Sequence, residues 1–253
     1  MRIKRIIPCL LLRNNGLVKT VRFKDSTYIG DPINTIKIFN EKEVDEIIFL
    51  DIDATRANKE PSYELIRNIS SECFMPFSYG GGIKSIKQIE EIIKSGAEKV
   101  VINSQAYLQR NFIRAAVNQF GSSTIVVSID IKKDFLRGNK VYIKGGSQNT
   151  GKNPVDYVKE IESEGAGEIL VNSIDRDGVM EGYDIELIKS ITQSVRIPVI
   201  ACGGAGKLDD FRSAFKNGGA SAAAAGSFFV FQGKRRAVLI TYPSYSEISN
   251  LFD

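Results

Sequence analysis

The sequence predicts a single (β/α)8 barrel, an α/β TIM-barrel fold, assembled from two similar halves. Short β-branched runs alternate with helix-length segments, as is typical of a parallel sheet covered by helices. The 253 residues suit eight strand–helix units in one domain. The chain also repeats itself, because a Tyr-Gly-Gly-Gly-Ile-Lys motif at 79–84 is matched by a Cys-Gly-Gly-Ala-Gly-Lys motif at 202–207. A repeat as long as half the chain indicates a duplicated half-barrel.

The repeat divides the single domain, residues 1–253, into half-barrels of about 1–121 and 122–253. Small residues of one half fall on small residues of the other at the same offset: Gly80, Gly96 and Ser104 on Gly203, Gly219 and Ser227. Equivalent positions of a duplicated barrel lie on opposite sides of its axis. A site built from the glycine motifs would therefore have two similar ends.

Eight mostly apolar runs are expected to form the strands: Ile3–Leu11, Glu46–Asp51, Met75–Tyr79, Lys99–Asn103, Thr124–Ile131, Glu168–Ser173, Pro198–Cys202 and Ser221–Ala225. Continuous apolar runs are typical of parallel strands buried on both faces. The segments between them have helical periodicity, as at Ile86–Ser95, or a proline near their start, as at Pro154. The glycine-rich stretch at 145–151 is expected to be a flexible loop after the fifth strand.

Composition excludes several classes of function. The net charge of +4 is dispersed, so no nucleic-acid surface is expected, and no stretch suits a membrane span. Three cysteines lie far apart without a Cys-x-x-Cys motif, which disfavours a metal site or a disulfide scaffold and fits a reducing cytoplasm. The absence of histidine removes Ser-His and Cys-His nucleophiles. Neither a metal nor a cofactor is expected.

The C-terminal ends of the strands carry the active site in barrels of this kind. Two glycine clusters stand there, Gly80–Gly82 and Gly203–Gly204, and each is followed one strand later by a small polar pair, Asn103–Ser104 or Gly226–Ser227. Glycine after a strand lets backbone N–H groups approach an anion closely. Two such phosphate cradles predict a long ligand with a phosphate at each end. Tight turns that hold no ligand are the alternative.

Asp130 ends the fifth strand and is the candidate base for proton transfer. A structural role, in which its carboxylate bonds loop amides, is the alternative. Its repeat partner is Leu11, so the carboxylate pair that a symmetric site would offer is incomplete. Asp51 and Asp177 are weaker candidates for similar duty.

Charged residues also stand at the starts of four different strands: Arg5, Glu46, Lys99 and Glu168. Such residues are either solvated at the base of the barrel or arranged around the axis in a salt-bridged layer. The residues by themselves favour neither arrangement.

Six specific motifs spread over nearly the whole chain: Leu50–Thr55, Tyr79–Ile83, Lys99–Ser104, Ser128–Asp130, Asn172–Gly178 and Pro198–Gly204. Together they closely resemble the cyclase subunit of imidazole glycerol phosphate synthase. The resemblance implies a duplicated (β/α)8 barrel with a glutaminase subunit on its N-terminal face. Ammonia would pass through the barrel to a nucleotide that carries two phosphates at the C-terminal face.

The resemblance also implies roles for individual residues. Asp130 matches the catalytic base, while Asp51 and Lys19, in the mobile first loop, match substrate-binding residues. The phosphate contacts match Gly82, Asn103, Ser104, Asp177, Gly178, Gly204, Gly226 and Ser227. The charged layer that gates the ammonia path matches Arg5, Glu46, Lys99 and Glu168.

One departure from the family pattern concerns catalysis. The second catalytic aspartate falls on Leu11, because this chain reads Cys-Leu-Leu-Leu where the family usually reads Cys-Leu-Asp-Val. Losing a general acid removes about two to four orders of magnitude in rate. An intact path and intact cradles with a broken catalytic pair resemble a paralogous branch encoded with surface-polysaccharide (lipopolysaccharide and O-antigen) genes. In that branch the barrel would feed ammonia to a sugar amidotransferase that makes acetamidino sugars, with a bis-phosphate or phosphosugar ligand.

We favour that role over histidine synthesis. The first alternative is a working cyclase with a shifted proton-transfer network through Asp51 or Asp177. The second is a non-catalytic scaffold that only activates a glutaminase.

Overall fold

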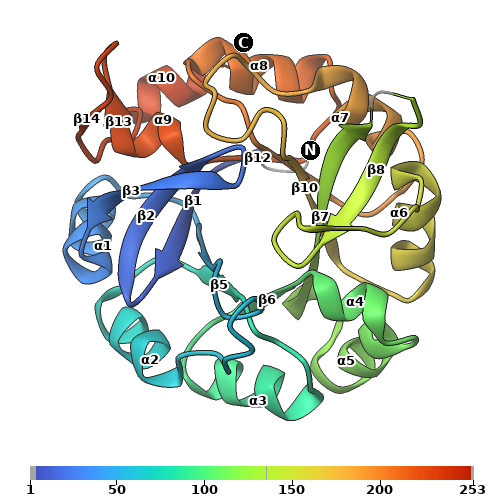
Figure 1. Cartoon of the computed structure of the whole chain (residues 1–253). Coiled ribbons are helices and arrows are strands. Elements are labelled where there is room, and N and C mark those ends of the chain that lie inside the picture. The colour runs from blue at the N-terminus through green and yellow to red at the C-terminus, as the bar shows by residue number, and fades with distance from the viewer. Residues whose placement is uncertain (1–3, 135, 252–253) are drawn as a thin grey trace.

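The computed structural model describes residues 4–134 and 136–251, in which eight parallel strands close into a barrel surrounded by helices (Figure 1). Each barrel strand pairs with the next one along the chain, and the last pairs with the first. The barrel strands are β1 (Arg5–Arg13), β4 (Ile47–Asp51), β5 (Phe77–Gly80), β6 (Lys99–Ile102), β7 (Ile125–Asp134), β10 (Glu168–Ser173), β11 (Val199–Cys202) and β12 (Ala222–Ala225). The predicted (β/α)8 barrel is confirmed.

Helices cover the outside of the barrel: α1 (Pro32–Glu41), α2 (Tyr63–Glu72), α3 (Ile86–Lys94), α4 (Ser104–Leu108), α5 (Phe112–Phe120), α6 (Pro154–Ser163), α7 (Ile185–Thr192), α8 (Leu208–Lys216), α9 (Ser227–Val230) and α10 (Tyr245–Ser249), with a 3-10 turn at Ser122–Thr124. Capping residues define several of their starts. Asp31 accepts the N–H of Asn34 before α1, and Ser85 forms a capping box with Gln88 at α3. Pro154 opens α6, where its missing N–H costs no helical bond.

The first barrel strand extends beyond its predicted end. The predicted first residue, Ile3, lies outside the described residues, and β1 continues past Leu11 to Arg13. Two strands that were not predicted follow it, β2 (Gly16–Val21) and β3 (Lys24–Gly30). β2 pairs antiparallel with β1, and β3 pairs antiparallel with β2, so the chain leaves the barrel wall as a small sheet on the side where the barrel strands end (Figure 1).

The turn between β1 and β2 explains this extension. Asn14 and Asn15 both have positive φ, 48° and 62°, as a two-residue hairpin of this hand requires, and asparagine tolerates that conformation. Lys19 consequently lies in β2 and is only 5% exposed. The segment around Lys19, which was expected to be a loop, is therefore part of a strand.

The fifth barrel strand is prolonged in the same way. β7 continues past Ile131 and pairs antiparallel with β8 (Gly138–Ile143), which pairs in turn with β9 (Gln148–Asn149). The stretch at 145–151, predicted to be a flexible loop, thus contains a short strand, because backbone hydrogen bonds to β8 order it. The remaining described strands, β13 (Phe231–Gln232) and β14 (Ala237–Val238), form a separate hairpin after α9.

The hydrophobic core has two parts. The larger part lies between strands and helices and includes Phe39 and Phe211, both 0% exposed. The smaller part fills the barrel interior, where Ile7, Ile48 and Leu170 lie with Ala222 and Ala224 of β12. Successive side chains of a strand point to opposite faces, so alternate residues of each strand belong to the two parts of the core. This arrangement leaves polar side chains at the two ends of the barrel axis.

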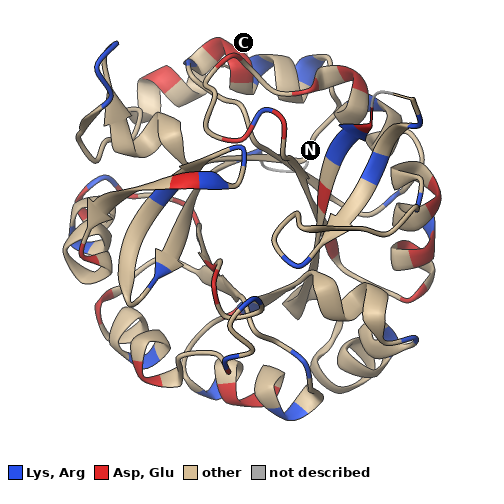
Figure 2. Ribbon diagram, viewed as in Figure 1, with Lys and Arg blue, Asp and Glu red and all other residues tan. Residues whose placement is uncertain are grey.

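Charged residues lie mainly on the outer helices and the connecting segments, with lysine and arginine interspersed among aspartate and glutamate (Figure 2). In this view neither sign of charge gathers on one part of the barrel. This distribution agrees with the dispersed charge in the sequence.

Replacing Phe39 by alanine should lower the free energy of unfolding by about 3–5 kcal/mol, because a fully buried ring leaves a cavity between α1 and the barrel. Urea unfolding followed by circular dichroism measures the change. Phe74→Ala is the matched control, since that ring is 86% exposed and its loss should change stability by less than about 0.5 kcal/mol. Equal losses for the two variants would contradict the assignment of the core.

Candidate functional site

A cavity at the C-terminal ends of the barrel strands, the mouth of the barrel, gathers residues from both halves of the chain. It is lined by the predicted mouth residues: Lys19, Asp51, Gly82, Asn103, Ser104, Asp130, Asp177, Gly178, Gly204, Gly226 and Ser227. The structure therefore brings these residues to one place. Their roles in binding and catalysis stay predictions.

The second glycine cluster forms a tight turn beside an unsatisfied hydroxyl. Gly204 has a φ of 121°, and a Cβ atom there would lie 2.2 Å from the carbonyl oxygen of Gly182, so only glycine fits. Ser227 is 4% exposed, and its Oγ has no hydrogen-bond partner within the described residues. An unsatisfied buried hydroxyl costs about 1–3 kcal/mol. A ligand oxygen at this cradle would remove that cost.

The first glycine cluster has a similar backbone, but its polar groups are already hydrogen-bonded. Gly81 and Gly82 have positive φ, 124° and 70°. The Asn103 side chain donates to the Asp130 carboxylate at 3.1 Å. The hydroxyl of Ser104 accepts the backbone N–H of Lys144 at 2.9 Å. The two cradles are thus alike in backbone and unlike in the state of their side chains.

Asp130 is a buried carboxyl that titrates near neutrality. Burial raises its pKa to about 7, the nearby charge of Asp177 raises it further, and the hydrogen bond from Asn103 opposes the shift. A carboxyl with a pKa near the working pH can both donate and accept a proton. The pKa of Asp130 therefore suits its predicted role in proton transfer.

Leu11 makes the opposite side of the mouth apolar. It pairs in register with Leu50 of β4, and both side chains line the cavity together with Cys9 and Cys202. No carboxylate from β1 faces Asp130 across this space. The part of the mouth around Leu11 is consequently apolar.

A buried ion pair ties the first hairpin to the opposite half-barrel. The Lys19 ammonium lies 2.7 Å from one carboxylate oxygen of Asp177, and the Thr20 hydroxyl donates to the other at 2.9 Å. The backbone N–H of Arg22 donates to the Asp177 carbonyl at 2.8 Å. Both carboxylate oxygens of Asp177 are therefore engaged with the hairpin, and Lys19 is held above the second cradle.

Asp51 makes the kind of contact that was the structural alternative for Asp130, because its carboxylate bonds loop amides. Its Oδ1 accepts the backbone N–H groups of Asp53 at 3.1 Å and Ala54 at 2.9 Å, which orders the turn after β4. Burial raises the pKa of Asp51, and these two hydrogen bonds counteract the shift. The side chain lines the cavity while holding its own loop.

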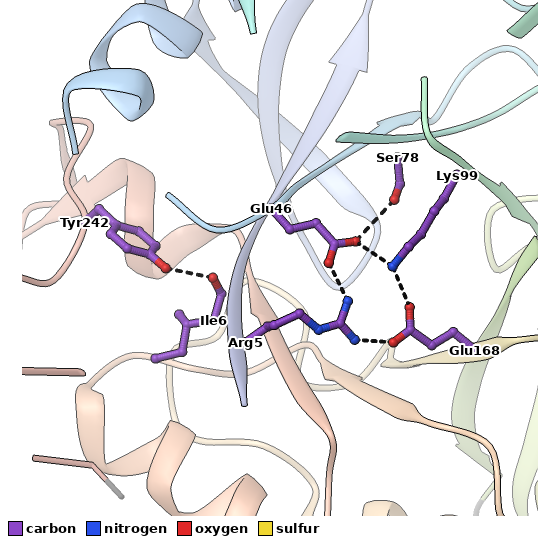
Figure 3. Close-up of polar contacts among 7 residues, drawn as sticks. All are labelled: Arg5, Ile6, Glu46, Ser78, Lys99, Glu168 and Tyr242. Atoms are coloured by element: carbon purple, nitrogen blue, oxygen red, sulfur yellow. Dashed lines mark hydrogen bonds and ion pairs between the residues drawn. The ribbon is translucent and has the colours of Figure 1, made fainter. Parts of the chain in front are cut away.

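At the other end of the axis, four charged residues form a closed ring of ion pairs (Figure 3). Arg5 contacts both Glu46 and Glu168. The Lys99 ammonium lies 3.2 Å from Glu46 and 3.0 Å from Glu168. Each carboxylate therefore touches both cations. Of the two arrangements left open by the sequence, the structure has the salt-bridged layer.

Sequence reasoning missed several residues of the mouth. Asn172 is paired in register with Asp130, lines the cavity, and has a buried Oδ1 without a partner in the described part of the chain. Ser128 also lines it. The only signal available was a polar residue at the end of an apolar run, Ile-Leu-Val-Asn-Ser at 169–173.

Metal and membrane features can be assessed for residues 4–134 and 136–251. Within them, no cluster of three or more histidine, cysteine, aspartate or glutamate side chains could hold a metal ion. No helix in the same ranges has the length and apolar character needed to span a bilayer.

The Asp130 carboxyl should titrate with a pKa of about 7, as followed by carbon-13 NMR of aspartate-labelled protein. Asn103→Ala should raise this pKa further, because the lost hydrogen bond stabilises the carboxylate. The folded pKa lies above that of an unfolded aspartate. The protonated side chain therefore favours folding below about pH 4, and this contribution is lost as the pH rises through 7. Asp130→Asn should flatten this pH dependence of stability. A titration midpoint near pH 4 for Asp130 in the folded protein would contradict the raised pKa.

The family described as Histidine biosynthesis protein matches residues 5–235. A Pseudomonas aeruginosa protein provisionally named imidazole glycerol phosphate synthase subunit hisF2 is 52% identical over 97% of this chain and 98% of its own. A Leptospira borgpetersenii protein provisionally named subunit HisF of the same synthase is 49% identical over 98% of each chain. The imidazole glycerol phosphate synthase subunit HisF of Alkaliphilus metalliredigens is 44% identical over 89% of this chain and 90% of its own. The chain therefore belongs to the family of HisF-type cyclase subunits of imidazole glycerol phosphate synthase.

Proposed function

We propose that this barrel receives ammonia from a glutaminase subunit on its N-terminal face and delivers it at the C-terminal mouth to a sugar amidotransferase of lipopolysaccharide or O-antigen biosynthesis. The observation that carries the proposal is Leu11. It stands across the mouth from Asp130, where a symmetric site would place a second carboxylate. The reduced thiols and the absence of metal motifs fit a cytoplasmic setting.

The residue at position 11 matters because ring closure requires proton transfer by two groups. A cyclase needs one group to donate a proton while another accepts one, and a single carboxyl cannot do both in the same step. Leucine transfers no proton. The other carboxylates that line the cavity already have partners, because Asp51 accepts hydrogen bonds from its own turn and Asp177 is paired with Lys19 and Thr20. A hydrogen bond with Cys9, together with burial, raises the pKa of the Cys202 thiol, so this thiol stays neutral. The mouth is therefore better suited to releasing ammonia than to consuming it.

The barrel interior supports the passage of a small neutral molecule. Above the ion-pair ring the axis is lined by apolar side chains, including Ile7, Ile48 and two alanines of β12, Ala222 and Ala224. An ammonium ion would pay a large desolvation cost there, whereas uncharged ammonia would not.

The cradles supply a means of coupling. A bis-phosphate nucleotide or a phosphosugar bound across the mouth would signal that an acceptor is present before glutamine is hydrolysed. The unsatisfied hydroxyl of Ser227 and the nearby ammonium of Lys19 favour an anion at the second cradle. Two similar proteins carry the numbered names hisF2 and hisF3, as expected for copies additional to a histidine enzyme.

Expression of this chain with its glutaminase should fail to rescue a histidine auxotroph that lacks the cyclase subunit. Leu11→Asp should raise cyclase turnover by about 100-fold, the lower end of a general acid's contribution. Growth of the auxotroph and a spectrophotometric assay of imidazole glycerol phosphate formation measure these outcomes. Leu50→Asp is the control, since it adds a carboxylate to the same wall at the neighbouring strand. Rescue by the unaltered chain would rule against the proposed role and favour the working cyclase.

Lys99→Ala should uncouple the two reactions without abolishing glutamine hydrolysis, because the ring loses the cation that bridges Glu46 and Glu168. The fraction of released nitrogen that reaches the amidated product should fall severalfold, while free ammonium rises or hydrolysis stalls. A glutamate dehydrogenase assay of free ammonium measures the partition. Lys94→Ala, which removes an exposed helix cation, is the control. Unchanged coupling in Lys99→Ala would remove the gate from the proposal.

A further inference from the structure

We propose that the thiols of Cys9 and Cys202 form a two-coordinate site for a soft monovalent metal ion, of which copper(I) is the cellular example. The two cysteines are far apart in the sequence, and the closed barrel brings them together. The site itself does not depend on the proposed delivery of ammonia.

The two cysteines lie at one level of the barrel interior. Cys9 belongs to β1 and Cys202 to β11, and β12 stands between these strands and pairs with both. Cys202 is in register with Ala224 of β12. Pro8 is in register with Ala225, so the cysteine after Pro8 stands two residues further along β12 than Cys202. Strands of an eight-stranded barrel are staggered in this way, and the inward side chains of alternate strands then form one layer.

Both thiols are buried and in contact with each other. Cys9 is 4% exposed and Cys202 is 7% exposed, and neither forms a disulfide. A hydrogen bond joins them, and both side chains belong to the apolar cluster inside the barrel and line the cavity. The intervening strand contributes only the methyl groups of Ala222 and Ala224 to this cluster. Two soft sulfur donors therefore share a space that is largely shielded from water.

The separation of the two strands disfavours a disulfide as the use of this pair. Neighbouring strands are about 4.8 Å apart, so Cα atoms on either side of an intervening strand are about 9 Å apart. A disulfide requires about 4.4–6.8 Å between its Cα atoms. A linear thiolate–metal–thiolate unit is longer, because two bonds of about 2.3 Å, the length of a zinc–thiolate bond, separate the sulfurs by about 4.6 Å. The spacing therefore suits a bridging metal ion.

The number and type of donors select the ion. A structural zinc site needs four ligands, and residues 4–134 and 136–251 contain no group of three or more histidine, cysteine, aspartate or glutamate side chains that could hold a metal. Copper(I) prefers thiolate ligands, and two of them in line satisfy it. On binding, each thiol releases one proton and each sulfur donates one electron pair to the ion. The oxidation states do not change, so no oxidant or reductant is required.

Lys19 lies where it can offset the negative charge of a copper(I) dithiolate. A Cβ atom placed on Gly226 would lie 2.9 Å from Cε of Lys19 and 3.0 Å from the carbonyl oxygen of Cys9, so the lysine stem lies close to the Cys9 backbone. The hydrogen bond with Cys9 and burial raise the pKa of the Cys202 thiol, whereas the Lys19 charge lowers it. A nearby cation favours the ionised sulfur, and a bound metal removes the thiol proton outright.

An ion at this site would obstruct the barrel axis. The cysteine pair lies between the ion-pair ring at one end of the axis and the open cavity at the other. The interior at this level is packed with side chains, so a bound ion and its two sulfurs would narrow the remaining path. Copper(I) should therefore inhibit the passage of ammonia. This consequence rests on the proposed function, whereas the site does not.

The binding test uses the full-length chain, reduced with a phosphine and kept free of oxygen, with copper(I) itself as the probe. Competition with the chromophoric chelator bicinchoninate should show one ion per chain, and X-ray absorption should show two sulfur neighbours. Cys9→Ala and Cys202→Ala should each weaken binding by at least about 100-fold, because the second thiol acts at high effective concentration. Cys73→Ala is the matched control, since it removes a half-buried thiol outside the barrel interior and should keep full affinity.

Equal copper(I) affinity in the unaltered chain and in Cys9→Ala or Cys202→Ala overturns the site, and so does a loss of affinity in Cys73→Ala. Circular dichroism checks that each variant is folded. If a variant fails to fold, X-ray absorption of the unaltered chain still decides, because fewer than two sulfur neighbours overturns the site.

A second measurement separates the site from the proposed function. With the glutaminase and the acceptor enzyme present, copper(I) should lower the fraction of nitrogen that reaches the amidated product severalfold, and Cys202→Ala should abolish this inhibition. Unchanged transfer with the ion bound overturns the obstruction and leaves the site standing. A copper-free chain that transfers no nitrogen overturns the proposed function, while the binding result for the two thiols is unaffected.

Discussion

The pairing of β1 with β12 is the constraint on which the rest of this structure depends. Those hydrogen bonds close the sheet, and closure turns alternate side chains of every strand towards a common axis. The interior has little room, so Ala222 and Ala224 of β12 face larger side chains such as Ile7 and Ile48. Closure also separates the two ends of the axis. One end carries a ring of four charges, and the other a cavity lined by residues from both halves.

Burying the ring of charges costs free energy, and the fold offsets this cost by placing each charge next to partners of opposite sign. Buried ions lose hydration, and this loss is offset only when every charge has well-placed partners. Here Glu46 and Glu168 each contact both Arg5 and Lys99. A ring of this kind adds little net stability compared with apolar packing.

The mouth shows how a duplicated backbone can carry unequal chemistry. The two glycine clusters adopt similar positive φ values because both must turn sharply after a barrel strand. Their side-chain surroundings nevertheless differ, since Ser104 is hydrogen-bonded and Ser227 is not. Asp130 faces a leucine instead of a second carboxylate. The second half thus carries both a titratable group and a buried hydroxyl without a partner among the described residues, while the first half supplies the apolar patch around Leu11.

The sequence by itself determined the eight barrel strands, the twofold repeat and most mouth residues, because apolar periodicity and glycine placement are local signals. It also showed that Leu11 breaks the expected pair. Only the tertiary structure decided that Lys19 is buried against Asp177 and that Asn172 stands beside Asp130. It alone also closed the four charges into a ring. These outcomes join residues more than forty positions apart, or, for Lys19, depend on an antiparallel hairpin that forms by pairing with β1. Such contacts are set by strand register and barrel closure, which no single stretch of sequence encodes.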